Sequence, residues 1–255
     1  MEFISFPREF GAASMSEDGK QQFQPFENDI QKGGAYQYTT GERYSARVAN
    51  ARISDVANTV LDLRGMKVLD IGCGDGTYTF ELYHRSKPLS IHGIDLSEGA
   101  IATAQSKSPD PSVTFSTCSG SKLPFADNTF DVAHVRGVLH HMDHPEEGVA
   151  EALRVARKII IVEPNGWNPV LKVIEKTSKY HIEHRERSFT SSLIESWCTA
   201  RGARVTNRTW AGLVPFFCPE PFARFLKSIE PVVEKIPVAR QLSCAVFAVT
   251  AERPA

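Results

Sequence analysis

The stretch Val68-Leu69-Asp70-Ile71-Gly72-Cys73-Gly74-Asp75-Gly76-Thr77 decides the fold of this chain. Residues 66–71 form a short run rich in β-forming side chains, which runs into glycines at alternating positions. A helical stretch then starts at Thr77. Glycine adopts positive φ and lets a ligand approach the backbone closely, and a helix start directs amide donors and partial positive charge at the turn. The stretch therefore predicts a strand, a ligand-binding turn and a helix.

Further apolar runs alternate with helical stretches after this turn. The expected strands are 89–94, 112–116, 130–135 and 158–163, and the expected helices are 77–85, 98–107 and 145–156. Continuous apolar strands separated by helices are typical of a parallel sheet covered on both faces. Two later segments, 203–210 and 243–251, also look strand-like. The predicted fold class is α/β: a Rossmann-like, doubly wound, mostly parallel seven-stranded sheet with helices on both faces.

We expect one domain with additions. Residues 1–60 are predicted to form an N-terminal arm and a lid helix, and 61–255 the domain proper. The periodicity loosens near 165–190 and 213–240, where we expect lid insertions over the pocket.

The composition excludes several classes of protein. The 255 residues include 29 Lys+Arg and 30 Asp+Glu, and this net charge of −1 disfavours nucleic acid as a partner. No apolar run approaches the roughly 18 residues of a membrane helix, and the N-terminal stretch does not resemble a secretory signal. The five cysteines are scattered and contain no CxxC pair, so we expect a reducing cytoplasmic location and no structural metal site.

A second acid complements the glycine turn. Asp95 ends the second expected strand, 23 residues after Gly72, where a carboxylate suits a ribose diol. The dinucleotide fingerprint GxGxxG would need its third glycine at the position of Thr77. The negative charge of Asp75 would also be unfavourable beside a pyrophosphate. An acidic loop suits a ligand with ammonium and sulfonium charges. A nicotinamide-dependent oxidoreductase, whose dinucleotide would bind at the same turn, is the alternative function.

At these residues the sequence resembles the class I S-adenosylmethionine-dependent methyltransferases, whose loop reads (D/E)xGxGxG. Asp70, Gly72, Gly74 and Gly76 match that loop in full. The resemblance continues to Pro164. Over this range the sequence resembles small-molecule and lipid methyltransferases such as those of quinone biosynthesis. The segments that carry the resemblance are Gly93–Ser97, Leu123–Phe125, Phe130-Asp131, Val138–Met142 and Glu163-Pro164.

The resemblance implies S-adenosyl-L-methionine as cofactor and gives roles to individual residues. Gly72, Cys73 and Gly74 would lie along the methionine portion, with Asp70 nearby, Asp95 on the ribose and Leu96 beside the adenine. Where many relatives have an acid for the adenine amino group, this chain has Ser119, whose hydroxyl or a backbone carbonyl is expected to substitute. A tyrosine-bearing N-terminal segment closes over the cofactor in similar enzymes, and Tyr36 or Tyr44 is the candidate here. Arg136, at the end of the fourth strand, is a candidate for the methionine carboxylate or an acidic acceptor.

The implied reaction is SN2 methyl transfer to O or C of a small-molecule or lipid-linked acceptor. A base is needed only where the acceptor carries a proton, and His140 and His141 are the candidates, with His144 nearby. Packing or helix capping is the other interpretation of these histidines. A non-catalytic S-adenosylmethionine-binding protein is the remaining alternative function. The oligomeric state stays open.

Two further clusters have more than one interpretation. His181 and His184 are spaced to touch one ligand on a helix, but the neighbouring charges favour a solvated face. Phe222, Phe225, Leu226 and Ile229 follow helical spacing, which fits a lid, a peripheral membrane contact or a helix packed on the core.

Overall fold

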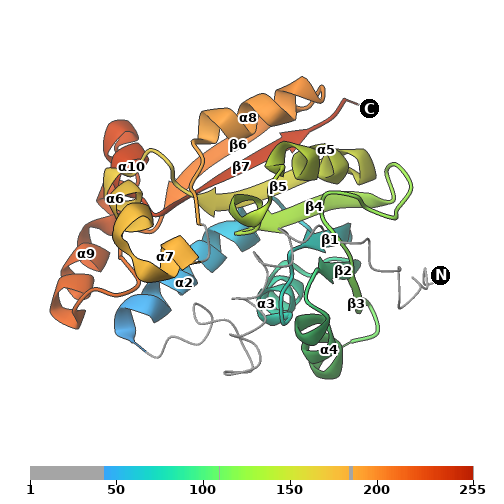
Figure 1. Cartoon of the computed structure of the whole chain (residues 1–255), viewed down its shortest axis with the longest axis horizontal. Coiled ribbons are helices and arrows are strands. Elements are labelled where there is room, and N and C mark those ends of the chain that lie inside the picture. Colours follow the sequence, from blue (N-terminus) through green and yellow to red (C-terminus); the bar gives the residue numbers. More distant parts are fainter. Residues whose placement is uncertain (1–42, 109, 184–185, 255) are drawn as a thin grey trace.

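The computed structural model describes residues 43–108, 110–183 and 186–254, and a seven-stranded sheet runs through them (Figure 1). Its spatial order is β3-β2-β1-β4-β5-β7-β6. The strands are β1 (Lys67–Ile71), β2 (Ser90–Asp95), β3 (Val113–Thr117), β4 (Phe130–Arg136), β5 (Ala156–Pro164), β6 (Arg204–Ala211) and β7 (Val246–Glu252). β7 runs antiparallel to both of its neighbours, and the other neighbouring strands of the sheet run parallel to each other. The predicted mostly parallel, doubly wound sheet is confirmed.

Helices cover both faces because β1, β4 and β5 are apolar on both sides. Leu69 and Ile71 pack with residues of α5 (Pro145–Val155) and α8 (Ser191–Ala200) on one face. Val68 packs on the opposite face with residues of α2 (Tyr44–Thr59) and α3 (Thr77–Ser86). A third cluster joins α4 (Glu98–Lys107) to β3.

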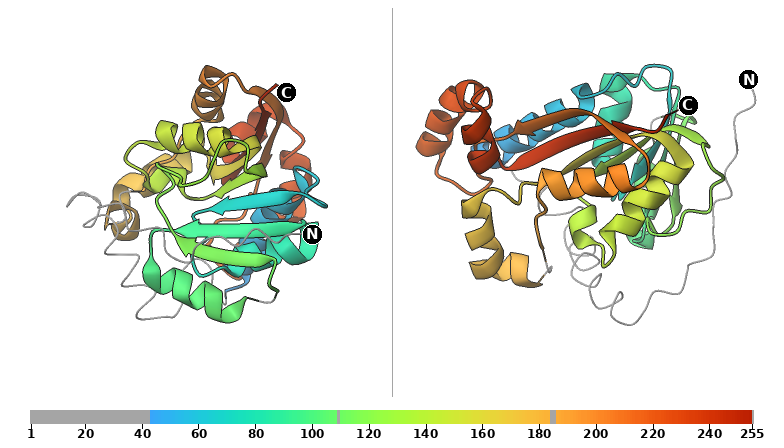
Figure 2. Two further views of the ribbon diagram at one scale, coloured as in Figure 1. Left: turned by 90° about the vertical axis from the view of Figure 1, so that its right-hand side faces the viewer. Right: turned by 90° about the horizontal axis from the view of Figure 1, so that it is seen from above.

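The two expected insertions contain short helices at one end of the molecule (Figures 1 and 2). They are α6 (Pro169–Thr177), α7 (Lys179–Glu183), α9 (Glu220–Val233) and α10 (Pro237–Ser243). Proline stands in the first turn of α6, α9 and α10, where its missing N–H costs no helical hydrogen bond. Within the described parts of the chain, no helix has both the length and the apolar character to cross a membrane.

Candidate functional site

The glycine loop lies between β1 and α3, at the carboxyl edge of the sheet. Gly72, Gly74 and Gly76 have φ of 76°, 54° and 81°, a region that favours glycine. The N–H groups of Gly72 and Cys73 both donate to the Ile94 carbonyl, at 2.8 and 3.0 Å, and tie the loop to β2. A Cβ on Gly72 would lie 2.5 Å from a methyl carbon of Val138. The loop therefore requires glycine for conformation and for space.

Asp95 links this loop to the end of β2. One carboxylate oxygen accepts the Gly74 N–H at 2.9 Å, and the other accepts the Ser97 N–H at 2.9 Å. An ionised carboxylate accepts hydrogen bonds through both oxygens, which is the chemistry that a ribose diol requires. Asp95 is half-buried beside the glycine loop, and the half-buried Leu96 lies next to it.

Negative charge surrounds the loop. Burial raises the pKa of the Cys73 thiol well above its usual value, and the carboxylates of Asp95, Asp70 and Asp75 raise it further. Negative charges that disfavour a thiolate at this place also disfavour a pyrophosphate and favour a cationic ligand. These residues therefore fit a sulfonium nucleoside better than a dinucleotide.

Asp70 is held inside the protein. It pairs with His134 in the register of β1 and β4, and its Oδ1 lies 2.8 Å from the His134 Nδ1. Its Oδ2 accepts the Thr79 hydroxyl at 2.5 Å, and the side chain is buried. Because both oxygens have protein partners, this geometry supports a role in holding the start of the loop against α3.

Arg136 lies at the end of β4 among aromatic and hydroxyl side chains. Its guanidinium carbon lies 3.6 Å from the centroid of the Tyr78 ring, and Nη1 donates to the Ser54 hydroxyl at 3.1 Å. Burial lowers the pKa of Arg136. The side chain thus joins α2 and α3 to the sheet edge, and its positive charge faces the acidic loop region.

A buried carboxylate organises the segment after β4. Glu163, at the end of β5, is fully buried, and its Oε1 accepts the N–H groups of Val138 and Leu139, both at 2.9 Å. Its Oε2 lies 2.6 Å from the His140 Nδ1. A carboxylate only accepts, so Nδ1 carries the proton and the His140 Nε2 has an available lone pair when the ring is neutral.

Charge controls the protonation of His140. Burial disfavours its imidazolium form, but the charge and hydrogen bond of Glu163, assisted by Glu186 and Glu175, outweigh burial and raise the pKa of His140. A raised pKa with a fixed tautomer is the environment of an acid–base group.

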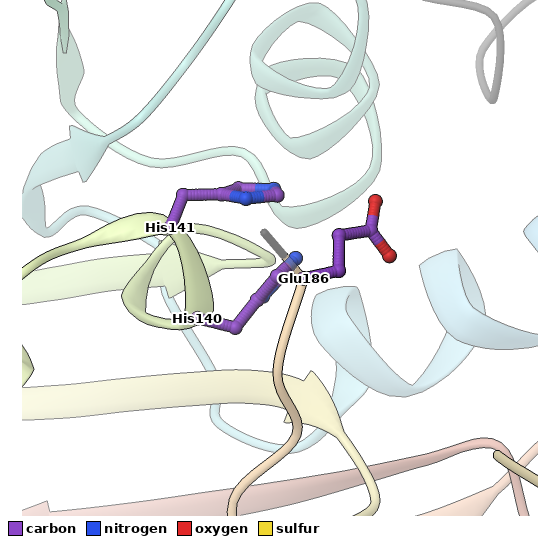
Figure 3. A group of neighbouring side chains, drawn as sticks. All are labelled: His140, His141 and Glu186. Atoms are coloured by element: carbon purple, nitrogen blue, oxygen red, sulfur yellow. The ribbon is translucent and has the colours of Figure 1, made fainter. Parts of the chain in front are cut away.

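His140, His141 and Glu186 come together beside this pair, and we call these three residues the histidine cluster (Figure 3). The two rings have centroids 3.8 Å apart, and one ligand atom from each of the three residues lies within 4.8 Å of the others. Glu186 follows α7 and forms an ion pair with His181 at 3.2 Å. Imidazole and carboxylate donors are ones that transition-metal ions accept, so these residues are also the candidates for holding a metal.

The structure brings most of the predicted residues to one edge of the sheet, but not all. Ser119 is half-buried near Asp95, whose carbonyl accepts the Cys118 N–H at 3.0 Å. Tyr36 lies outside the described residues. His144 is exposed.

We predicted that His181 and His184 lie on a solvated face. That prediction is wrong for His181, which is buried against Glu186. His184 lies outside the described residues. A hollow of about 330 Å³ lies away from the loop, between the start of α2 and residues 217–220.

Sequence reasoning gave no role to Glu163, His134, Thr79 or Glu186. Glu163 had a signal, since it is a charged residue at the end of an almost pure Ile/Val strand. His134 also had one, because adjacent parallel strands bring it level with Asp70. Glu186 had none, because its position depends on how the insertion folds back.

The fold, and the comparisons with known proteins, agree with the resemblance to class I S-adenosylmethionine-dependent methyltransferases. Residues 69–160 match the family described as methyltransferase domain. The demethylmenaquinone methyltransferase of Renibacterium salmoninarum is 32% identical over 111 residues, which are 42% of this chain and 45% of that protein. The chain thus matches about half the length of this curated relative.

Solved structures share the fold over most of the chain. A possible histamine N-methyltransferase from Thermotoga maritima has a TM-score of 0.65 and 18% identity, over 91% of this chain and 98% of that one. The magnesium protoporphyrin IX methyltransferase of Synechocystis, solved with bound SAH (S-adenosylhomocysteine), has a TM-score of 0.64 and 16% identity, over 94% and 100%.

Proposed function

We propose that this protein is an S-adenosylmethionine-dependent methyltransferase that methylates O or C of a small-molecule or lipid-linked acceptor. One observation carries the proposal: the glycine loop and Asp95 form an acidic cradle at the same sheet edge as the buried Glu163–His140 pair. The name of the curated relative, a demethylmenaquinone methyltransferase, supports an acceptor of quinone type. The five free cysteines support a reducing, cytoplasmic location.

The residues of the site bind and align the reactants. Bound S-adenosylmethionine supplies an electrophilic methyl group on a sulfonium. Asp95 accepts hydrogen bonds from the ribose, while Gly72, Cys73, Gly74 and Gly76 let the backbone approach the ligand. Alignment of a nucleophile with an electrophile is worth effective molarities of about 10⁵ M or more, about 7 kcal/mol.

His140 is the proposed general base. Glu163 holds its Nδ1–H, so Nε2 receives the proton of a hydroxyl or carbon acid. His141 is the proposed positioning residue, since its ring lies against that of His140, tilted by 48° with the centroids 3.8 Å apart. Arg136 is the proposed partner of a carboxylate on cofactor or acceptor. Leu96 and Ser119 complete the proposed cofactor site, and Asp70 supports it by holding the start of the loop.

Calorimetry with S-adenosylhomocysteine tests the cofactor site. Removal of the Asp95 carboxylate loses two ligand hydrogen bonds to a charged group, each worth at least about 1.5 kcal/mol, so Asp95→Ala should weaken binding by about 100-fold. Asp62→Ala, at an exposed carboxylate outside the site, is the matched control. Near-normal affinity in Asp95→Ala would remove the ribose assignment.

A thermal-shift comparison separates the oxidoreductase alternative. A ligand at 100 times its dissociation constant stabilises by about 2.7 kcal/mol, so S-adenosylhomocysteine should raise Tm where NADH does not. The reverse result would replace the proposed function with the oxidoreductase.

Isotope transfer tests catalysis and identifies the acceptor. The protein is incubated with methyl-labelled S-adenosylmethionine and a metabolite and lipid extract, and labelled products are identified by mass spectrometry. We expect a labelled O- or C-methyl product that His140→Ala forms at least 100-fold more slowly. Tight binding without any labelled product would favour the non-catalytic alternative, and wild-type rates of His140→Ala at every pH would remove His140 from catalysis.

A further inference from the structure

Exposed apolar side chains are concentrated in the two insertions. Among the described residues, thirteen large hydrophobic side chains are exposed, and all but Leu89 and Leu193 lie in 167–182 and 217–242. We call these eleven residues the apolar face: Trp167, Val170, Val173, Ile182, Phe217, Phe222, Phe225, Val232, Ile236, Val238 and Leu242. Concentration of this kind marks an interaction surface, since apolar residues scattered singly are the normal case.

Helix α9 exposes aromatic side chains and buries a carboxylate. Phe222, Phe225 and Val232 point outward and are 51%, 56% and 61% exposed. On the inward side Glu230 is buried together with Ala223, and it accepts the Leu213 N–H at 3.0 Å. The interpretation in which this aromatic stripe packs on the core is therefore wrong for Phe222 and Phe225.

A second inward carboxylate fixes this orientation of α9. Glu234 accepts the Gly212 N–H at 3.0 Å and forms an ion pair with Arg52 of α2 at 2.6 Å. Rotating α9 to bury its apolar stripe would expose Glu230 and Glu234 and break these contacts, so the outward stripe is built into the fold.

Helices α6 and α10 extend the same face. None of their residues is buried within the helix bounds. Buried amides join them: the Asn165 Nδ2 donates to the Gln241 carbonyl at 2.8 Å, and the Asn168 Nδ2 donates to the Ser243 carbonyl at 3.2 Å. Figures 1 and 2 show α6, α9 and α10 together at one end of the molecule.

The charges around the apolar face have one dominant sign. The exposed cations among the described side chains of its two segments are Lys176, Lys179, Arg224 and Lys235. Glu220 is the one exposed acid among the same described side chains, and it pairs with Arg224 at 2.7 Å. Exposed cations therefore outnumber exposed acids around the described part of the apolar face.

We infer that the apolar face docks on the surface of an anionic lipid bilayer. Amphipathic helices with exposed aromatic and aliphatic side chains insert at the boundary between headgroups and acyl chains, and a basic rim binds anionic headgroups. Helix α6 follows β5 within a few residues, so the apolar face is connected to the strand that carries Glu163. The inference goes beyond the proposed activity, because docking is measured without cofactor or turnover.

Vesicle sedimentation with the full chain tests the docking. We expect binding to vesicles of phosphatidylcholine with phosphatidylglycerol and at least tenfold weaker binding to phosphatidylcholine alone. The double variant F222D/F225D should weaken binding to the anionic vesicles at least tenfold. L193D, at an exposed apolar residue outside the face, is the matched control and should bind like wild type. Unchanged binding of F222D/F225D, or no binding of wild type, would overturn the inference.

Two further measurements distinguish the other occupants of the face. Brominated phosphatidylglycerol should quench the fluorescence of Trp167, which is exposed on the face, and leave that of the buried Trp210. A wild-type protein that does not bind vesicles but is a dimer by light scattering, and a monomer as F222D/F225D, would assign the face to a second copy of the chain instead. Retained S-adenosylhomocysteine binding by F222D/F225D shows that the variant is folded.

Discussion

Replacing Glu163 by glutamine changes the charge beside His140 at nearly constant shape. The His140 Nδ1 lies 2.6 Å from a carboxylate oxygen of Glu163, and both side chains are buried. The glutamine carbonyl can still accept the N–H groups of Val138 and Leu139, so the segment after β4 should keep its position. Two things disappear: the negative charge that stabilises the imidazolium form, and the acceptor of the His140 Nδ1–H, because the amide nitrogen of glutamine takes the place of Oε2.

The expected change follows from the two opposing influences on His140. An opposite charge at this distance shifts a pKa by roughly 1–3 units, about 1.4–4 kcal/mol. Without it, burial dominates, so the pKa of His140 should fall from above its ordinary value of 6.5 to below it in Glu163→Gln. If His140 is the base, the rising limb of the pH–rate profile should move to lower pH in the variant. The maximal rate should also fall, because the amide of glutamine donates to Nδ1 and so leaves the proton of the neutral ring on Nε2.

The loss of folding stability in Glu163→Gln should depend on pH. Because the folded pKa of His140 is raised, the wild-type pair contributes fully below the unfolded pKa of about 6.5 and loses this contribution as pH rises through the folded pKa. Glu163→Gln should therefore be more destabilising at pH 6 than at pH 9.

Histidine side-chain NMR titration and urea unfolding at both pH values measure these effects. Glu147→Gln, at an exposed acid of α5, is the control and should change neither quantity. A pKa of His140 that stays the same or rises in Glu163→Gln would refute the electrostatic reasoning, whatever happens to activity.

Three further predictions concern the loop, the sheet and the histidine cluster. Gly72→Ala places a Cβ 2.5 Å from Val138 at a residue with positive φ. It should lower the free energy of unfolding in urea by about 2–4 kcal/mol. Gly65→Ala, at a residue with φ of +72° but open space around the new Cβ, should lose only the stability that the backbone conformation costs. Equal losses of stability in the two variants would exclude the packing argument at Gly72. Burial lowers the pKa of His92 from 6.5 to about 4, so folding stability should fall by about 3 kcal/mol as pH drops through that window. His92→Gln should remove this dependence, and an unchanged pH profile would show that His92 is not its source. Chelation by EDTA should leave labelled-product formation unchanged if His140 acts as a base, whereas loss restored by zinc would assign a metal to the histidine cluster.

The sequence predicted the local elements well because their signals are local. The strand–glycine–helix stretch at 66–85 needs particular φ values and an apolar strand, and both are written in adjacent residues. The second acid, Asp95, followed from the rule that ligands lie at the carboxyl ends of parallel strands. Its hydrogen bond to the Gly74 N–H was not predictable from either segment alone.

The insertions were less predictable. The Phe-rich segment near 213–240 has the periodicity of an amphipathic helix, but periodicity does not say which side of a helix faces the core. That choice depended on inward partners distant in sequence, above all Arg52 for Glu234 and the Leu213 N–H for Glu230.

The sequence by itself determined the glycine turn, the order of strands and helices, and the acids around the glycine loop, because each depends on backbone preference and spacing within a few residues. Tertiary structure alone decided that Glu163 holds His140, that Glu186 returns to the same place, and that α9 turns its aromatic side outward. Those arrangements join segments tens of residues or more apart, and only packing and the need to satisfy buried polar groups select them.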